Sequence, residues 1–583
     1  RLHRVAAEQK VSFYRGRQME IPLVEIADHW RQAGEMEKYR DTLLSASRRS
    51  MARFDLRGSR DQYRELLGLL DQRNERSEMW TEAHMALAEL ARRFGEFGLA
   101  EDHYRRIIDQ GVARGRERSR ALRGFGHLLT IQCRYKEATT YYSQALDWSH
   151  QIKDVAGVAK ALVGLSRIHL MQSDNRAGEL VRKRLEDMLP NLEEQEVIGK
   201  VLLHLSESAL RRGRLGGRYD YLIRARAAFE QSQDRQGLSD ALIALGGALM
   251  SPAMNAPNRF QEAEKVLREA LELKRSIGDR HGVAEAFRAL GQLEMEVGNY
   301  EMAENLLKQS LNIHQALGAP FYIGATHNAL GVLLIVQRKY RRSDDHFDRA
   351  IDIFKRMGDQ IAISQPLLNK GITAINQRNI NQAQIYLREA RRIKESLGSS
   401  WALFDLRNNL AIVAMWLGEF EGAEKLLEET LQHVDTHGTG EDRALARSLM
   451  GLLRCFQSRL QMAALELGRA RADAEDLNID RVTVFCQANA AFYASLTESQ
   501  ATFESLIKNV EAVDVLHAID RDVWLELLEN MAMHTVQRER SRQALRLLRN
   551  VATFWARFGQ QGRADALNTQ ATELENELNA VQT

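Results

Sequence analysis

The stretch AEAFRALGQLEMEVGNYEMAENLLKQSLNIHQALG, residues 284–318, decides the fold because its pattern returns at a constant spacing. Leu290 and Gly291 open a series of equivalent pairs, each 40 residues after the last. The later pairs are Leu330-Gly331, Lys370-Gly371, Leu410-Ala411 and Met450-Gly451. A fixed period of about 20 to 50 residues is the sequence signature of a solenoid built from repeated structural units.

Each unit is predicted to hold two helices joined by a short turn, with no β-sheet. The first helix carries the Leu-Gly pair, and the turns are predicted near residues 298, 338, 378 and 418. An aromatic or aliphatic residue then opens the second helix: Tyr300, Tyr340, Ile380, Phe420 and Leu460. Glycine or asparagine closes it, as is common at helix C-termini: Gly318, Gly358, Gly398, Gly438 and Asn478.

Small residues recur where two helix backbones must approach closely. Gly291, Gly331 and Gly371 are therefore expected to be buried at helix crossings. In the second helix the small residues are Ala303, Ser343, Ala383, Ala423 and Ala463. The Leu-Gly pair, the Tyr and the alanines resemble the tetratricopeptide repeat family, in a 40-residue form. The resemblance implies an all-α, right-handed superhelical solenoid of about twelve to thirteen helical pairs that binds proteins.

The chain is interpreted as three parts. Residues 1–80 form a degenerate helical segment, residues 81–560 form the repeat array, and residues 561–583 form a capping helix. The units of the array centre near residues 87, 125, 165, 205, 245, 290, 330, 370, 410, 450, 490 and 530. The unit at 245 carries an insertion in its turn, SPAMNAPNR, residues 251–259.

The first fifty residues carry a second resemblance. Leu2-His3-Arg4-Val5-Ala6, then Ala27-Asp28-His29-Trp30 with Ala33-Gly34, resemble the segment that follows the ATPase part of MalT-like regulators and multidomain signalling ATPases. This resemblance implies a place in a signalling protein. Because the sequence opens on Arg1 and not on Met, we expect that it continues a longer protein.

Composition excludes several classes of protein. The 583 residues have a formal net charge of +2, which gives no overall drive toward nucleic acid or anionic membranes. Three distant cysteines argue against a disulfide framework or a zinc site. No apolar run approaches the roughly 18 residues of a membrane span, and no signal peptide is recognised, so we expect a cytoplasmic protein. The six prolines are expected at helix starts or in loops.

Motifs for catalysis or cofactor binding are not found. No Gly-rich loop ends in Lys-Ser or Lys-Thr, and the 16 histidines include no HExxH pair. We therefore expect no enzyme activity, no cofactor and no metal from this chain. Arginines cluster between residues 105 and 123 and between 211 and 226, but acids interrupt them and no aromatic residues alternate with them. Nucleic-acid binding is therefore disfavoured, and membrane binding is not expected.

The concave groove is the predicted binding surface. In the family that the repeat resembles, the first helix of each unit lines this surface. Counting from the Leu-Gly pair, the inward positions are basic in the early units and apolar with asparagines in the later ones. The candidate partner-binding residues are Arg120, Arg123, His127, Arg167, Arg211, Asn328, Val336, Ile375, Asn376, Asn408, Met415, Trp416 and Phe456. Asparagines can pair with the backbone of an extended peptide, and large apolar side chains can anchor it.

Three functions stay open at this point. The chain is expected to bind a protein or peptide in its groove as the sensor or scaffold arm of a cytoplasmic signalling protein. Alternatively, it is the regulatory region of a larger enzyme whose NTPase, kinase or cyclase domain precedes residue 1, or a stand-alone peptide receptor or assembly adaptor. The occupant of the groove is also open, since the apolar positions could pack against neighbouring repeats, a returning terminus or another domain of the same protein.

Overall fold

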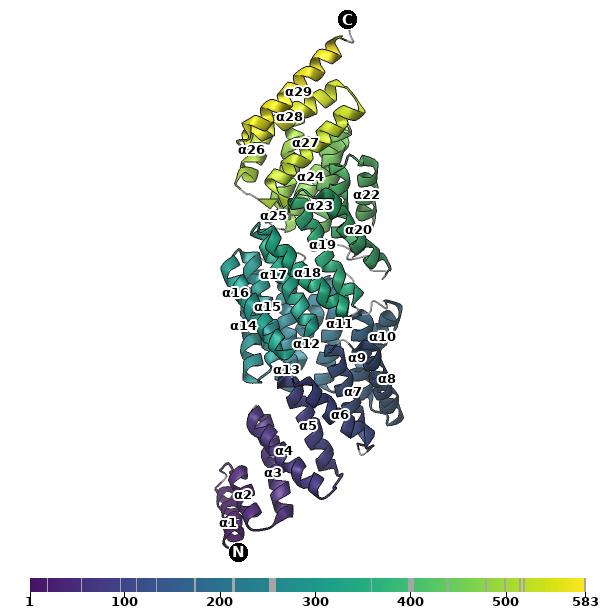
Figure 1. Ribbon diagram of the computed structural model, residues 1–583. Coiled ribbons are helices and arrows are strands. Elements are labelled where there is room, and N and C mark those ends of the chain that lie inside the picture. The colour runs from purple at the N-terminus through teal and green to yellow at the C-terminus, as the bar shows by residue number, and fades with distance from the viewer. Residues whose placement is uncertain are drawn as a thin grey trace.

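The computed structural model shows an elongated stack of helices with the two termini at opposite ends (Figure 1). It describes residues 1–580 except 18, 54, 95, 112, 133, 172–174, 212–214, 251–257, 358, 397–402, 438–439, 478–479, 498–499, 513–514 and 517–518. Almost every described element is an α-helix, as the all-α solenoid prediction requires. The predicted insertion, Cys133 and the four glycine or asparagine helix ends at 358, 398, 438 and 478 lie outside the described residues.

The helices follow one another in pairs along the chain. The N-terminal third contains α1 (Leu2–Gly16), α2 (Leu23–Gln32), α3 (Met36–Ala52), α4 (Leu56–Gln72), α5 (Glu78–Phe94), α6 (Phe97–Asp109), α7 (Gly115–Ile131), α8 (Tyr135–Gln151), α9 (Val155–Met171) and α10 (Asn175–Met188). The middle contains the 3-10 helix η1 (Leu189–Asn191), α11 (Gln195–Arg211), α12 (Leu215–Ser232), α13 (Arg235–Leu249), α14 (Arg259–Ser276), α15 (Arg280–Val297), α16 (Tyr300–Leu317), α17 (Pro320–Val336), α18 (Tyr340–Met357), α19 (Gln360–Asn376) and α20 (Ile380–Ser396).

The C-terminal part continues the stack and adds one small irregularity. It contains α21 (Phe404–Trp416), α22 (Phe420–His437), α23 (Gly440–Phe456), α24 (Leu460–Leu477), α25 (Asp480–Leu496), α26 (Gln500–Glu511), β1 (Val515–Leu516), β2 (Ile519–Asp520), α27 (Arg521–Arg538), α28 (Arg542–Arg557) and α29 (Gln561–Ala580). The antiparallel pair β1–β2 corrects the expectation of no β-sheet. The twelve predicted unit centres all fall inside odd-numbered helices, α5 to α27.

The turns inside the units confirm the 40-residue register. A residue with left-handed backbone geometry stands at each predicted position: Gly298, Arg338, Arg378 and Gly418. At each of them the following amide bonds back to a carbonyl of the preceding helix, as Lys339 N does to Leu334 O at 2.8 Å. This is the pattern of a Schellman cap, which satisfies the last carbonyls of a helix. The register is therefore fixed by local backbone chemistry as well as by packing.

The repeated glycines lie at helix crossings, as predicted. Gly291, Gly331 and Gly371 are buried. A Cβ at Gly331 would lie 2.4 Å from the ring of Phe347, which belongs to the second helix of the same unit. Since real Cβ atoms do not approach other atoms so closely, this position requires glycine for the two helices to touch.

Gly331→Leu is expected to destabilise the protein by about 2–5 kcal/mol, because the new side chain overpacks the crossing and pushes α17 from α18. Gly468→Leu on α24 is the matched control, since nothing lies within 4 Å of a Cβ at that exposed position. Thermal or chemical unfolding monitored by circular dichroism measures both. Equal losses in the two variants would contradict the crossing assignment.

Helices near the start of the chain contact helices about two hundred residues later, on the next turn of the superhelix. Arg93 of α5 donates to the carbonyl of Ile277, just before α15, at 3.5 Å. A Cβ at Gly278 would lie 2.6 Å from Leu56 of α4. Farther along, the hydroxyl of Tyr135 on α8 lies 3.5 Å from the carboxylate of Asp359, just before α19. These contacts join residues about two hundred positions apart and fix the pitch of the superhelix.

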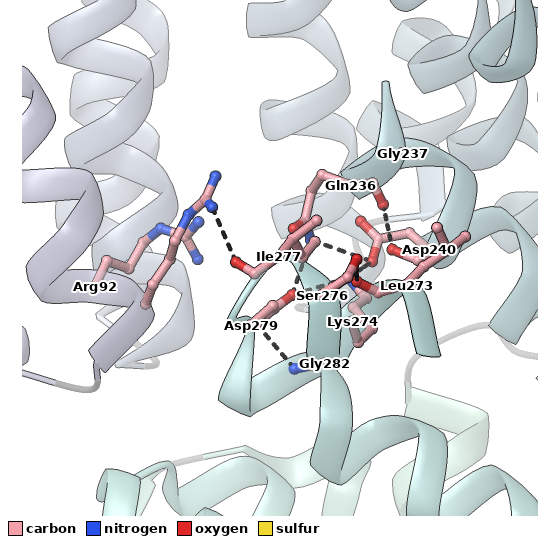
Figure 2. A network of polar contacts seen from close by, with 12 residues as sticks. Arg92, Gln236, Gly237, Asp240, Leu273, Lys274, Ser276, Ile277, Asp279 and Gly282 are labelled. Carbon is pink, nitrogen blue, oxygen red and sulfur yellow. Dashed lines mark hydrogen bonds and ion pairs between the residues drawn. The ribbon is translucent and has the colours of Figure 1, made fainter. Parts of the chain in front are cut away.

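A buried cation stabilises the α14–α15 turn that takes part in these contacts. Lys274 is 1% exposed, and its ammonium group contacts Asp240 of α13 and the carboxylate of Asp279, the latter at 2.9 Å (Figure 2). Gln236 donates to the same Asp279 carboxylate at 2.9 Å, and so does the amide of Gly282 at the start of α15, at 3.0 Å. Burial raises the pKa of Asp279, but Lys274 and these donors outweigh it and hold the pKa well below its usual range.

Pro366 departs from the expectation that every proline lies at a helix start or in a loop. It stands inside α19. Because proline has no N–H, the carbonyl of Ala362, four residues earlier, receives no helical hydrogen bond from it. As for membrane insertion, none of the described helices combines the length and the apolar character that crossing a bilayer demands.

Candidate functional site

The odd-numbered helices line the interior of the superhelix. His127 of α7 is surrounded by charged groups from three other odd-numbered helices: Arg92 of α5, Arg167 of α9 and His281 of α15. Burial, together with the charges of the two arginines, lowers the pKa of His127 to about 3. These side chains from distant repeats therefore share one enclosed space, as expected for the concave face of a closed superhelical turn.

The basic candidates at the N-terminal end of this face differ in their surroundings, and Arg167 is the one with a described acidic partner. Arg167 lies 3.5 Å from Glu207, which raises the pKa of the arginine. Arg123 is half-buried and donates to Ser119, and burial lowers its pKa. Arg120 is exposed, whereas the side chain of Arg211 lies outside the described part of the chain. The inner face therefore carries acidic as well as basic side chains, which corrects the expectation that it is simply basic.

A cavity of about 290 Å³ opens between the first helices of three successive units, α15, α17 and α19. Apolar side chains form most of its wall, and polar groups from all three units interrupt it. The lining residues are Arg288, Gln292, Met295, Leu307, Phe321, Ala325, Asn328, Ala329, Val332, Phe354, Asp359, Ala362, Gln365 and Pro366. Apolar walls with a few convergent polar groups are typical of ligand sites.

The polar groups of this cavity suit a peptide backbone. Asn328, a predicted site residue, accepts a hydrogen bond from the side-chain amide of Asn369 at 3.0 Å through its oxygen, which leaves its own amide nitrogen directed elsewhere. The Arg288 guanidinium donates a hydrogen bond to the side-chain oxygen of Gln292 at 3.2 Å. Pro366 and Ala362 both line the cavity, and Pro366 has no N–H to donate to the carbonyl of Ala362. Together they supply a donor and an acceptor.

The C-terminal candidates are not exposed. Ile375, Asn376, Asn408, Met415 and Phe456 are all buried, whereas Val336 and Trp416 are half-buried. This corrects the expectation of an open apolar surface over residues 330–456. The physical reason is that other parts of the same chain cover it, through packing between repeats and through the segment that contains β2 and α27.

Residues 519–538 cross the inner face of the later units and contact three successive turns. Asp520 lies 3.2 Å from Arg338. Glu526, about two helical turns on, accepts a bond from Arg378 at 2.6 Å. His534, two more turns along, packs over the backbone of Gly418. At 1.5 Å per residue, these steps are about 9 and 12 Å, close to the 8–10 Å between packed helices. The segment therefore matches the spacing of the repeats.

Polar and apolar contacts together hold this segment. The backbone amide of Asp520 donates to the side-chain oxygen of Asn376 at 2.8 Å. Trp524 is fully buried, and its indole N–H donates to Asn489 of α25 at 2.9 Å. Phe456 stacks on Phe492 with ring centroids 5.1 Å apart, in the same core. Asn376 thus contacts the segment 519–538 of its own chain, whereas Phe456 packs against α25.

Potential metal ligands and thiols can be located in the part of the chain that the structure describes. Within it, no three His, Cys, Asp or Glu side chains are placed to hold a metal ion. Cys455 and Cys486 are unpaired and buried, and burial raises the pKa of Cys486 to about 12. A thiol that stays protonated in this way is a poor nucleophile.

Comparison with known families identifies the repeats. Residues 258–316 and residues 405–432 match family profiles described as tetratricopeptide repeat. The two segments cover α14–α16 and α21–α22, which are regular helical pairs of the solenoid. The tetratricopeptide units thus support a helical-repeat scaffold for protein interaction. No curated protein matches the sequence.

Three solved structures are similar to the chain in fold. A Rap protein complexed with Competence and Sporulation Factor is 13% identical, with a TM-score of 0.37, over 75% of this chain and 98% of that one. The apo form of RapI is 13% identical, with a TM-score of 0.38, over 61% and 97%. A signal transduction ATPase with a tetratricopeptide repeat sensor from Pyrococcus horikoshii is 15% identical, with a TM-score of 0.36, over 65% and 53%.

Proposed function

We propose that the concave face binds a peptide segment of a partner protein, and that the chain is the sensor or scaffold arm of a cytoplasmic signalling protein. The observation that carries this proposal is that the C-terminal half of the same face already holds a chain segment, residues 519–538, through one contact per repeat. The N-terminal resemblance to multidomain signalling ATPases favours the sensor role.

The cavity between α15, α17 and α19 is the proposed anchor site for the partner. Its volume of about 290 Å³ accommodates a large apolar side chain. Phe321, Phe354 and Val332 would contact that side chain, while Asn328 and the carbonyl of Ala362 would pair with the peptide backbone on either side. An extended peptide with one bulky apolar residue is therefore the expected ligand class.

A displayed library of random peptides, selected on the immobilised protein, tests this proposal. Peptides enriched for one bulky apolar residue are expected, and fluorescence polarisation of a labelled selected peptide gives its affinity. Ala325→Trp should weaken binding at least about tenfold, because the indole fills the cavity.

The control is Met302→Trp, which adds the same indole at an exposed position of the outer helix α16. It is expected to bind the peptide as the unmodified protein does. Peptides that bind both variants equally would show that the cavity is not the anchor site, and a selection that enriches nothing would reject peptide binding by this face.

A further inference from the structure

A strongly basic hollow lies where α17 turns into α18, away from the cavity described above. It measures about 790 Å³, and its lining includes Arg338, Lys339, Arg341 and Arg342 but only one carboxylate, that of Asp344. All four cations lie within five consecutive residues of the chain and are exposed. Such a concentration of one charge contrasts with the concave interior, where arginines are paired with glutamates.

Two of these cations take part in no ion pair among the described residues. Arg342 lies 3.6 Å from Glu304. Lys339, in contrast, donates to the neutral amide of Gln337 at 2.8 Å. Its charge helps Lys308 and Arg342 to lower the pKa of Glu304 without a direct ion pair. Arg341 is exposed, and among the described side chains no ion pair to it is seen. Their charges are therefore available to an anionic group from outside.

The position of these cations is also unfavourable for the helix they begin. Arg341 and Arg342 stand in the first turn of α18, which contains no acid. The equivalent turns of α16 and α22 contain Glu301 and Glu421. Cations near a helix N-terminus oppose the helix dipole and lower the stability of the helix. Residues that lower the stability of a helix in this way are expected at positions that take part in binding.

The rim of the hollow already receives a carboxylate. Asp520, which is 4% exposed, lies 3.2 Å from Arg338 at one end of the basic turn. We propose that the hollow formed by Arg338, Lys339, Arg341 and Arg342 is a second docking surface, which binds a carboxylate-rich peptide segment of a partner protein. This proposal does not depend on the cavity between α15, α17 and α19.

An acidic peptide fits this surface better than a nucleic acid does. Single-stranded nucleic acids need aromatic platforms for their bases beside the cations. The one aromatic residue of the hollow, Tyr340, is half-buried, and it lies against Asp520. Consecutive carboxylates of a flexible peptide, in contrast, can reach four cations that lie within five residues.

The test measures binding of a fluorescein-labelled oligoglutamate peptide to the full chain by fluorescence polarisation at low and physiological salt. The double variant Lys339→Glu/Arg341→Glu should weaken binding at least about tenfold, and binding should fall as salt is added. The matched control is Lys265→Glu/Arg268→Glu on the exposed face of α14, which changes the net charge equally. It should keep the original affinity.

Equal weakening by both double variants would overturn the proposal, because net charge alone would then explain binding. Binding of a labelled oligothymidylate with the same affinity and the same sensitivity to Lys339→Glu/Arg341→Glu would also overturn it in favour of a general polyanion surface. If the reversed variant fails to fold, Lys339→Gln/Arg341→Gln serves instead, with a loss of about threefold or more expected. Unchanged affinity in that folded variant would reject the site.

Discussion

Trp524→Ala is expected to lower the stability of the C-terminal half of the protein by about 3–5 kcal/mol. Trp524 is fully buried between α25, α27 and α28, and its ring lies 5.7 Å from that of Phe554. The substitution leaves a cavity the size of an indole and removes the donor to Asn489. Because a repeat array unfolds in parts, hydrogen exchange resolved by helix is the appropriate measurement, with faster exchange expected in α19 to α27.

Trp524→Phe separates the two contributions. It keeps an aromatic ring in the core but leaves the buried oxygen of Asn489 without its donor, at an expected cost of about 1–3 kcal/mol. The N-terminal helices α5 to α13 serve as an internal control and should exchange at their original rates in both variants. If Trp524→Ala leaves exchange in α19 to α23 unchanged, the segment 519–538 does not cover the inner face of those repeats.

The repeat was predictable from the sequence because it depends on residues that are close together in the chain. The spacing from Leu290 to Leu330 and the turn residues Gly298 and Gly418 are sequence features, and each depends on contacts within one unit or between neighbours. Arg338 and Arg378 adopt the left-handed conformation that glycine adopts at the equivalent turns. They show that the register holds even where the typical residue is missing. Local chemistry repeated many times therefore determines this part of the fold.

The repeat could not predict whether the groove is open or covered, because this depends on contacts between segments that are distant in the chain. Position counting places Ile375 and Met415 on the inner face, but it cannot show that α27 crosses that face. One signal in the sequence does point to this outcome. The run VWLELL at residues 523–528 is apolar at every position except Glu526, and a helix that is apolar on nearly all sides is expected to be buried.

The charges of the inner face illustrate the same limit. Arg167 is identified as basic from the sequence, but its pairing with Glu207 depends on how α9 and α11 pack. The acid-base pairs Asp520–Arg338 and Glu526–Arg378 were missed for the same reason, since each joins residues well over a hundred positions apart. Periodicity predicts which residues face inward but not which opposite charges meet there.

Acidification from pH 7 to pH 5 is expected to destabilise the fold by several kcal/mol. His84, His314 and His327 are buried, with exposures of 0%, 0% and 4%. Burial lowers the pKa of His84 to about 3 and those of His314 and His327 to about 4. The neighbours His103 and His346 add to the effect at His84 and His327, whereas Glu285 opposes it at His314.

The direction follows from proton uptake. Below the ordinary histidine pKa of about 6.5, these histidines are protonated in the unfolded chain but not in the folded chain. Stability therefore falls as the pH falls from about 6.5 toward the pKa values of the folded state. At pH 5 the loss is about 2 kcal/mol for each such histidine, or roughly 6 kcal/mol for the three. Glu89 and Glu285, whose pKa values are lowered to about 2, add to the loss only below about pH 4.5.

Chemical denaturation at pH 7, 6 and 5 measures this slope, and two comparisons test its cause. Because burial is the largest cause at all three histidines, salt should change the slope little, since screening acts on charges and not on desolvation. His84→Gln, which can still pair with His103, should remove about 2 kcal/mol of the loss at pH 5. A flat profile between pH 7 and pH 5 would mean that these imidazoles reach water within the folded solenoid, and hence that the packing between its repeats is looser than their burial implies.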